Sequence, residues 1–210
     1  RMRLMDERAD QIAAGLITTE MQNNIQVSRP TSPGYLGFLS SLGFNSDFDF
    51  AIDIADTGFD IGSADANLMH KDFTNAAGLS RVAYLNDWTN DHHPSPTHDT
   101  LGHGTINTSI ALGFNNKTGS AFTDANGYAY GLGSAPFARI GISKLFEDID
   151  LNGNGGGFVV PSFTAYIAAA YQGGARISSN SWGSSCDFGC NSYTDDSTIY
   201  DNLVRDADPF

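Results

Sequence analysis

The chain has 210 residues, 40% of them hydrophobic, and a formal net charge of −13, with 24 acidic against 11 basic residues. This length fits one domain with a sizeable buried core, and no apolar run reaches the roughly 18 residues that a membrane-spanning helix needs. The acidic excess argues against nucleic acid or an anionic membrane surface as a partner, since both attract Lys and Arg.

The N-terminal part of the chain shows only weak patterning. Residues 6–14 are compatible with either a short helix or a strand. Residues 28–34 contain two prolines and a glycine and predict a turn. Apolar side chains at helical spacing follow in residues 35–43, where Gly43 ends the predicted helix.

A clear strand pattern begins at Phe48. Apolar side chains occupy every second position from Phe48 to Ile54, which is the period-two pattern of a β-strand, and Gly58 ends it. Asp53 lies inside this strand, and the pattern does not explain a charged residue there.

After this strand, helices and strands alternate along the chain. We predict a strand, a helix of small residues, a strand, a helix, a strand and a final helix at residues 80–85, 105–113, 138–146, 161–171, 175–183 and 197–206. Crossovers of a dozen or more residues between strands imply parallel pairing, with helices packed on the sheet. The predicted fold class is therefore α/β, a parallel sheet with helices on both faces.

Two short motifs that contain glycine carry candidate chemistry. The segment Asp56–Gly58 follows the apolar strand, and the segment Gly102–Thr105 opens the helix of small residues. In open parallel sheets, functional groups gather beyond the carboxyl ends of the strands. A carboxylate there can accept an imidazole N–H, fix the tautomer of the ring and stabilise its cationic form. Asp56 and His103 are therefore the candidate catalytic residues.

The two candidates also need each other on electrostatic grounds. His103 lies at a predicted helix start, where the positive end of the helix dipole disfavours a charged imidazole. A nearby anion such as Asp56 offsets this effect. We therefore expect folding to bring the two side chains within hydrogen-bonding distance.

Four motifs follow one another in a specific order along the chain. They are an Asp-Thr-Gly segment in residues 51–60, a His-Gly-Thr segment in 103–113, a glycine-rich segment in 131–140 and the sequence Asn180–Gly183. Together they resemble four regions of the subtilisin-like serine proteases, the subtilase or peptidase S8 family. These regions are the aspartate region, the histidine region, the lead into the next strand and the strand exit at the specificity pocket. The resemblance extends from Phe48 to Phe210.

The resemblance implies a serine endopeptidase that hydrolyses peptide bonds through an Asp-His-Ser triad. Asp56 would orient the base, and His103 would act as the base. The resemblance also implies two backbone segments that bind an extended polypeptide substrate by strand addition. They consist of Gly155, Gly156 and Gly157 on one side and of Ser181, Trp182 and Gly183 on the other.

The chain departs from the family pattern in two ways. Ile106 and Asn107 stand where most members carry His and Val. The Asn motif of the oxyanion hole and the Gly-Thr-Ser motif of the nucleophile do not occur in the 210 residues. We therefore expect an incomplete domain that is inactive alone. Residues 1–45 would be an N-terminal extension or a pro-segment remnant, and residues 46–210 the N-terminal and middle part of the catalytic domain.

The resemblance further implies a secreted, extracellular and monomeric enzyme that needs no cofactor for its chemistry. Structural calcium is an open alternative, because the family often uses it and the chain is acidic, but the sequence assigns no ligands. Residues 148–153 have the opening spacing of an EF-hand loop. Position twelve of that loop would be Val159 where a Glu is needed, so the loop is incomplete.

Two other functions fit parts of the sequence. A catalytically silent peptide-binding module with the same fold would need only the two binding segments. A zinc-dependent hydrolase would use the histidines and aspartates of residues 91–99, although their spacing matches no helical pair of zinc-binding histidines.

Two smaller features also leave alternatives open. Cys186 and Cys190 are compatible with either a disulfide or a pair of free thiols. Asn107 and Asn116 each begin a sequon for N-glycosylation, a pattern that is common by chance.

Overall fold

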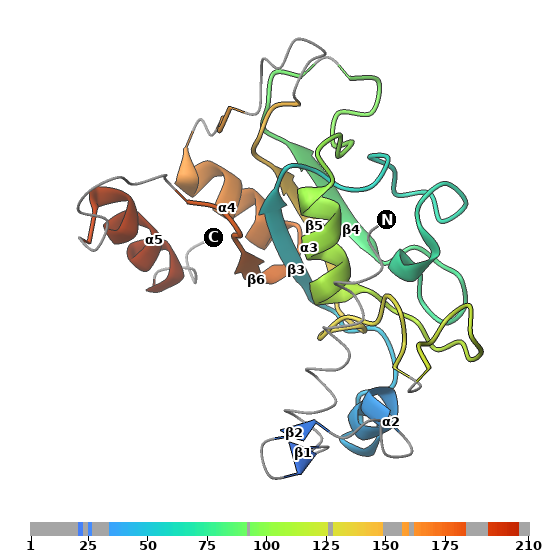
Figure 1. Ribbon diagram of the computed structural model, residues 1–210. Helices are drawn as coiled ribbons and strands as arrows, with labels where there is room; N and C mark the ends of the chain where they lie inside the picture. Colours follow the sequence, from blue (N-terminus) through green and yellow to red (C-terminus); the bar gives the residue numbers. More distant parts are fainter. Residues whose placement is uncertain are drawn as a thin grey trace.

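The computed structural model describes residues 21–22, 25–26, 34–91, 93–125, 128–148, 157–159, 162–183 and 193–205. Its centre is a four-stranded sheet (Figure 1) with the strand order β4-β5-β3-β6. The strands are β3 (Ala51–Asp56), β4 (Val82–Asp87), β5 (Arg139–Lys144) and β6 (Ala175–Ser179). Each neighbouring pair is parallel, as predicted.

Helices cover both faces of this sheet. Helix α3 (His103–Leu112) packs on one face, and helix α4 (Phe163–Gln172) packs on the other. The alternation in β3 explains this division, because Ile52 and Ile54 join the core cluster that contains Leu112 of α3. Ala51 and Ala55 lie on the opposite face of β3 and pack in clusters with Ala170 and Tyr166 of α4. The predicted α/β fold with helices on both faces is confirmed.

The observed helix and strand bounds differ slightly from those predicted. Helix α3 begins at His103 itself, two residues before the predicted start. The last helix, α5 (Asp195–Arg205), also begins two residues early and packs against α4. Strand β6 ends at Ser179, so the predicted strand exit at Asn180–Gly183 lies outside the sheet ladder.

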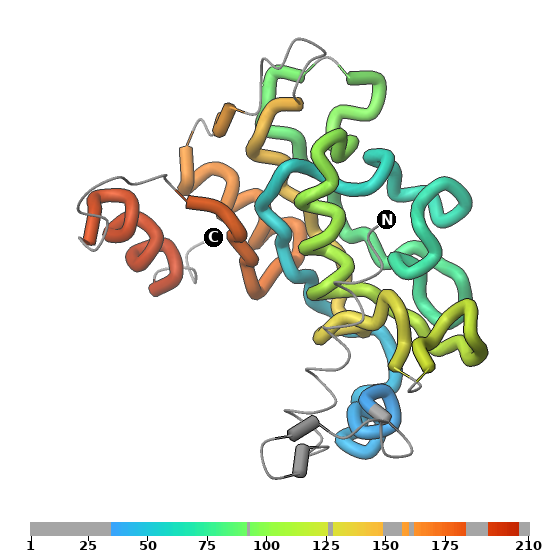
Figure 2. Tube along the Cα trace, viewed as in Figure 1, coloured from blue at the N-terminus to red at the C-terminus, as the bar shows by residue number. Residues whose placement is uncertain are grey.

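Smaller elements lie outside the central sheet. Helix α2 (Gly34–Ser41) matches the predicted helix in residues 35–43, and Tyr35 anchors it by donating a hydrogen bond to the carbonyl of Ser134 at 2.6 Å. Figure 2 shows α2 below the central sheet. The sequence analysis did not predict the short antiparallel pair β1 (Met21–Gln22) and β2 (Ile25–Gln26) or the 3-10 helix η1 (Lys71–Phe73). The predicted element in residues 6–14 lies outside the described residues.

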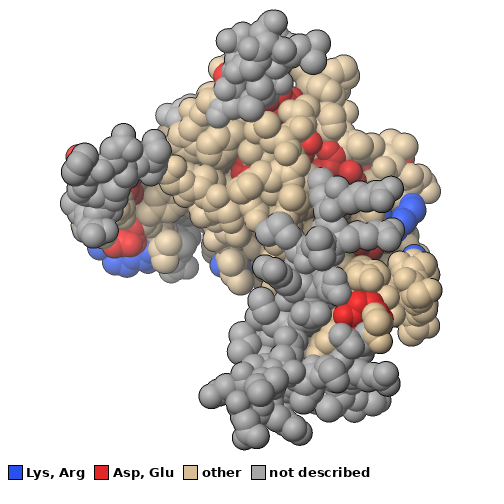
Figure 3. Space-filling model, in the orientation of Figure 1, with Lys and Arg blue, Asp and Glu red and all other residues tan. Residues whose placement is uncertain are grey.

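Acidic side chains dominate the charged groups on the face drawn in Figure 3. Asp and Glu are spread over the coloured part of this face, whereas Lys and Arg are confined to a few positions at its margins. This distribution agrees with the net charge of −13. Among the described helices, none has the length and apolar character needed to cross a bilayer.

Candidate active site

Asp56 is the last residue of β3, at the carboxyl edge of the sheet. Its side chain is only 2% exposed, so the carboxylate needs hydrogen-bond donors from the protein. The backbone N–H of Thr57 supplies one of them, at 2.7 Å from Oδ1. The strand end therefore presents a buried carboxylate whose orientation is set by its neighbours.

His103 is the first residue of α3, and its ring meets this carboxylate. The distance from its Nδ1 to Oδ1 of Asp56 is 2.7 Å, which brings together the two residues that the sequence analysis placed at the site. Because Oδ1 can only accept, Nδ1 carries the proton and donates it. Nε2 of this tautomer is then free to accept a proton, on a side chain that is 54% exposed.

Close backbone packing holds α3 against the end of β3. The backbone N–H of Gly104 donates to Oγ1 of Thr57 at 2.9 Å, which ties the first turn of the helix to the residue after Asp56. A side chain at Gly104 would collide with the carbonyl oxygen of Gly58. Gly58 itself has φ of 134°, a conformation open to glycine and rarely to other residues. The glycines of both motifs therefore allow the approach of Asp56 and His103.

Asp99 is a second buried carboxylate, which the sequence analysis did not single out. It accepts hydrogen bonds from the backbone N–H groups of Gly102 at 2.8 Å and Thr105 at 2.7 Å, and from the hydroxyl groups of Thr57 and Thr105. A carboxylate here accepts from backbone N–H groups that have no partner within the helix. Its negative charge is stabilised by the positive end of the helix dipole. The sequence signal for this role of Asp99 was an acidic residue a few positions before a predicted helix start.

Asn107 was noted as a departure from the family pattern and as the start of a sequon, yet it contacts the candidate pair. Its Nδ2 donates to Oδ2 of Asp56 at 2.8 Å and lies 3.2 Å from Nδ1 of His103. Asn107 follows His103 by four residues, so both lie on the same face of α3. The helical spacing could have indicated this contact.

The predicted substrate-binding segments are described in part. Gly155 and Gly156 lie outside the described residues, whereas Gly157 is exposed and its carbonyl accepts the N–H of Glu147 at 3.0 Å. Ser181 and Gly183 are exposed. Trp182 is partly buried, and its Nε1 donates to the carbonyl of Ala55, next to Asp56, at 2.9 Å.

An aromatic contact links the two segments. The ring of Phe158, the residue after Gly157, lies 4.7 Å from the ring of Trp182 between centroids. Phe146 and Phe163 extend this cluster, at 6.2 and 6.5 Å from Trp182. The structure thus places Trp182 of one predicted segment beside Phe158, the residue that follows the other segment.

Comparison with known protein families gives this geometry a context. The model of the subtilase family, peptidase S8, matches residues 48–208. The chain belongs to the subtilase family. Membership implies a serine peptidase, whose substrates are polypeptides. The comparison with curated proteins found no match.

A buried lysine lies beside the candidate active site of this subtilase. Lys144 ends β5, and its side chain is fully buried between Asp91 and Asp148, with Nζ–O distances of 3.0 and 2.9 Å. Its Nζ also donates to the carbonyl of His98 at 3.1 Å. Burial alone would lower the pKa of Lys144, but the hydrogen bonds and charges of Asp148 and Asp91 outweigh burial and raise it.

The histidine-rich loop of residues 91–99 is where the zinc alternative would place its metal. Nδ1 of His98 and Nε2 of His93 lie 3.1 Å apart, so one neutral ring can donate to the other. Within the described ranges, no group of three or more His, Cys, Asp or Glu side chains could hold a metal ion. The zinc alternative therefore gains no support from the described part of the subtilase. Most of the EF-hand-like loop and both cysteines lie outside the described residues.

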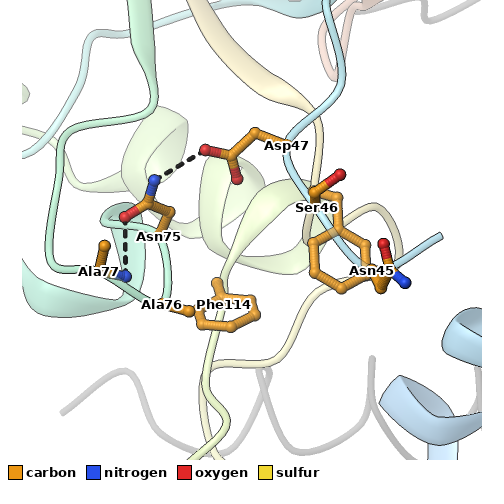
Figure 4. A pocket seen from close by; sticks show the side chains of 8 residues that line it. Asn45, Ser46, Asp47, Asn75, Ala76, Ala77 and Phe114 are labelled. Carbon is orange, nitrogen blue, oxygen red and sulfur yellow. Dashed lines mark hydrogen bonds between the residues drawn. The ribbon is translucent and has the colours of Figure 1, made fainter.

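A small cavity lies elsewhere on the molecule (Figure 4). Its volume is about 220 Å³, and its wall is made by Asn45, Ser46, Asp47, Asn75, Ala76, Ala77, Phe114 and Phe137. Asn75 donates to Asp47 at 2.8 Å across its edge. The wall contains neither Asp56 nor His103.

Proposed function

We propose that this subtilase is a serine endopeptidase in which Asp56 and His103 are two members of an Asp-His-Ser triad. The observation that carries the proposal is the 2.7 Å hydrogen bond between a buried carboxylate and an exposed imidazole. The bond fixes the ring so that Nε2 is the basic nitrogen. This is the arrangement that a general base for acyl transfer needs.

The proposed reaction uses His103 twice. Nε2 takes the proton of a serine hydroxyl as the serine oxygen attacks the carbonyl carbon of the scissile peptide bond. The imidazolium then gives this proton to the leaving amine as the C–N bond breaks, which leaves an acyl ester on the serine. Water hydrolyses the ester by the same route. Asp56 stays ionised throughout and stabilises the imidazolium.

The proposal assigns the nucleophile to a serine outside the 210 residues. Neither the Gly-Thr-Ser motif of the nucleophile nor the Asn motif of the oxyanion hole occurs within them. Among the described residues, Nδ1 of His103 hydrogen-bonds to Asp56, and no serine is bonded to the ring. The chain as given would therefore supply the acid-base half of the site.

The substrate would bind as an extended strand between Gly155–Gly157 and Ser181–Gly183. The exposure of Ser181 and Gly183 supports this assignment, since strand addition needs an accessible backbone, whereas the carbonyl of Gly157 is already bonded to the N–H of Glu147. The side chains of Phe158 and Trp182 would border the bound peptide. By family membership, we also propose a secreted monomer whose chemistry needs no cofactor. Residues 1–45 would form an N-terminal extension or a pro-segment remnant.

The test is the gene product that carries the sequence beyond Phe210, assayed on casein and with a fluorophosphonate that labels activated serines. Casein cleavage and labelling are expected, and both should disappear in His103→Ala. Asn116→Ala, at an exposed position outside the site, is the matched control and should keep both. Peptide binding without cleavage or labelling would contradict the proposal and favour the silent binding module.

A further inference from the structure

The carboxylate of Asp56 has two oxygens with different partners. Oδ1 accepts from Nδ1 of His103 and from the N–H of Thr57, both at 2.7 Å. Oδ2 accepts from Nδ2 of Asn107 at 2.8 Å, and Asn107 is its only donor among the described residues. The second oxygen of the candidate triad aspartate thus depends on one side chain.

Burial makes this single donor important. The Asp56 side chain is 2% exposed, so solvent offers little replacement if the donor is removed. A buried, ionised oxygen without a donor is unfavourable. The terminal torsion of an aspartate is also broad, so the carboxylate can rotate unless both oxygens are held.

Asn107 is also placed to act on His103. It follows His103 by one helical turn, so α3 carries both the base and the donor that holds the partner of the base. Thr108 behind it is buried and bonded to the carbonyl of Gly104 at 2.8 Å, which fixes this turn of the helix. The amide is therefore presented to Asp56 by a rigid element.

The contact depends on a residue in which this chain departs from the family pattern. The position of Asn107 commonly carries Val in the family that the chain resembles, and Val has no donor. In this protein the amide nitrogen of Asn107 is bonded to Asp56.

We propose that Asn107 is a positioning residue for the candidate triad. By holding Oδ2, it keeps Oδ1 aimed at Nδ1 of His103 and so keeps Nε2 as the basic nitrogen. This inference rests on the proposed function only in treating the Asp56–His103 pair as catalytic. The geometry of the pair can be measured without turnover.

The test measures the far-downfield proton resonance of His103 Nδ1–H by NMR on the 210-residue protein. Asp56→Asn identifies the resonance by removing it. Asn107→Leu, which has a similar volume and no donor, should broaden the resonance or shift it upfield. Asn116→Leu is the matched control, because Asn116 is an exposed asparagine shortly after α3, and it should leave the resonance unchanged.

A second variant guards against loss of folding. Asn107→Asp keeps the shape of the side chain but replaces the donor with an acceptor, so the resonance should change in this variant too. An unchanged resonance in either folded variant would overturn the inference, because Asp56 would then be held without the amide.

Kinetics on the longer gene product separate this inference from the proposed function. Asn107→Leu should lower kcat by about 10-fold or more with KM within about two-fold, the size expected for one hydrogen bond to a charged group. Wild-type protein with the resonance but without proteolysis would contradict the proposed function alone. Full kcat in Asn107→Leu would contradict the positioning role alone.

Discussion

Gly104 in α3 lies against Gly58 so closely that a Cβ on Gly104 would be 2.3 Å from the carbonyl oxygen of Gly58. The same Cβ would lie 3.1 Å from Cβ of Asp56. The nearest obstacle is backbone, which cannot rotate away as a flexible side chain would. The start of α3 and the end of β3 are therefore joined by a contact that only glycine allows.

Gly104→Ala is expected to separate these two elements. The helix has to move to relieve the clash, which should lower the free energy of unfolding by about 2 kcal/mol and lengthen the Asp56–His103 contact. Urea unfolding measures the first effect, and the downfield proton of His103 reports the second. Gly183→Ala is the control for stability, since its Cβ would meet no atom within 4 Å. Equal unfolding midpoints for Gly104→Ala and wild type would contradict the prediction.

Lys144→Met is expected to destabilise the loops around the site. The change leaves Asp91 and Asp148 without their shared cation, and both carboxylates are mostly buried, with 15% and 17% of their side chains exposed. Breaking a buried ion pair from one side costs about 3 kcal/mol. Thermal unfolding should show the loss. Lys117→Met, at an exposed lysine, should change stability by less than about 0.5 kcal/mol.

The pH dependence of this variant provides a second check. Burial raises the pKa of Asp91, but hydrogen bonds from the Asp148 N–H and from Lys144 outweigh burial, and the net shift is downward. A lowered carboxyl pKa stabilises the fold above the ordinary pKa of the group, and this stability is lost as the pH falls through the lowered value. The difference between wild type and Lys144→Met should therefore shrink in acid. A constant difference from pH 7 to pH 2 would exclude this origin.

Local patterns predicted much of the site. The alternation from Phe48 to Ile54 placed Asp56 at a strand end, and the glycines around His103 placed that residue at a helix start. Both features depend on neighbouring residues, which sequence periodicity reports well. The helix dipole at His103, which calls for a nearby anion, and the family resemblance then supplied the expectation that the two motifs meet.

Contacts across the sheet could not be predicted in the same way. Thr57 and Asp99 are 42 residues apart, and their hydrogen bond depends on where the loop before α3 returns to the sheet. Lys144 was predicted inside a strand, but only the register that pairs it with Asp56 shows that it lies at the same edge of the sheet as the candidate site. Strand order and register set such contacts, and a single sequence does not report them.

Asp53, which the strand pattern left unexplained, has its partners on two other strands of the sheet, β5 beside it and β4 beyond β5. Its Oδ1 accepts from the hydroxyl of Tyr84 in β4 at 2.8 Å and from Ser143 in β5 at 2.9 Å. Gly141 and Gly173 leave space for the Tyr84 ring, because a Cβ at either residue would collide with that ring. Oδ2 of Asp53 is buried, and none of the residues that the structure describes donates a hydrogen bond to it.

This environment makes Asp53 a source of pH-dependent stability. Burial raises its pKa from 3.8 to about 6, and the hydrogen bonds from Tyr84, Ser143 and Ser178 offset burial only in part. A raised pKa means that the folded state holds the proton more tightly than the unfolded state. The contribution is then most favourable below pH 4 and is lost as the pH rises through about 6.

Asp53→Asn should remove this dependence, because an amide stays neutral at every pH and keeps an oxygen for Tyr84 and Ser143. The rise of the Asp53 pKa from 3.8 to about 6 corresponds to about 3 kcal/mol, so the variant should be more stable than wild type by up to that amount at pH 8. At pH 4 the two proteins should unfold at similar urea concentrations. Asp49→Asn, at an exposed position in the approach to β3, is the matched control and should follow wild type at both pH values. A variant less stable than wild type at pH 8 would show that the ionised carboxylate of Asp53 is stabilised by its neighbours, contrary to the unpaired Oδ2.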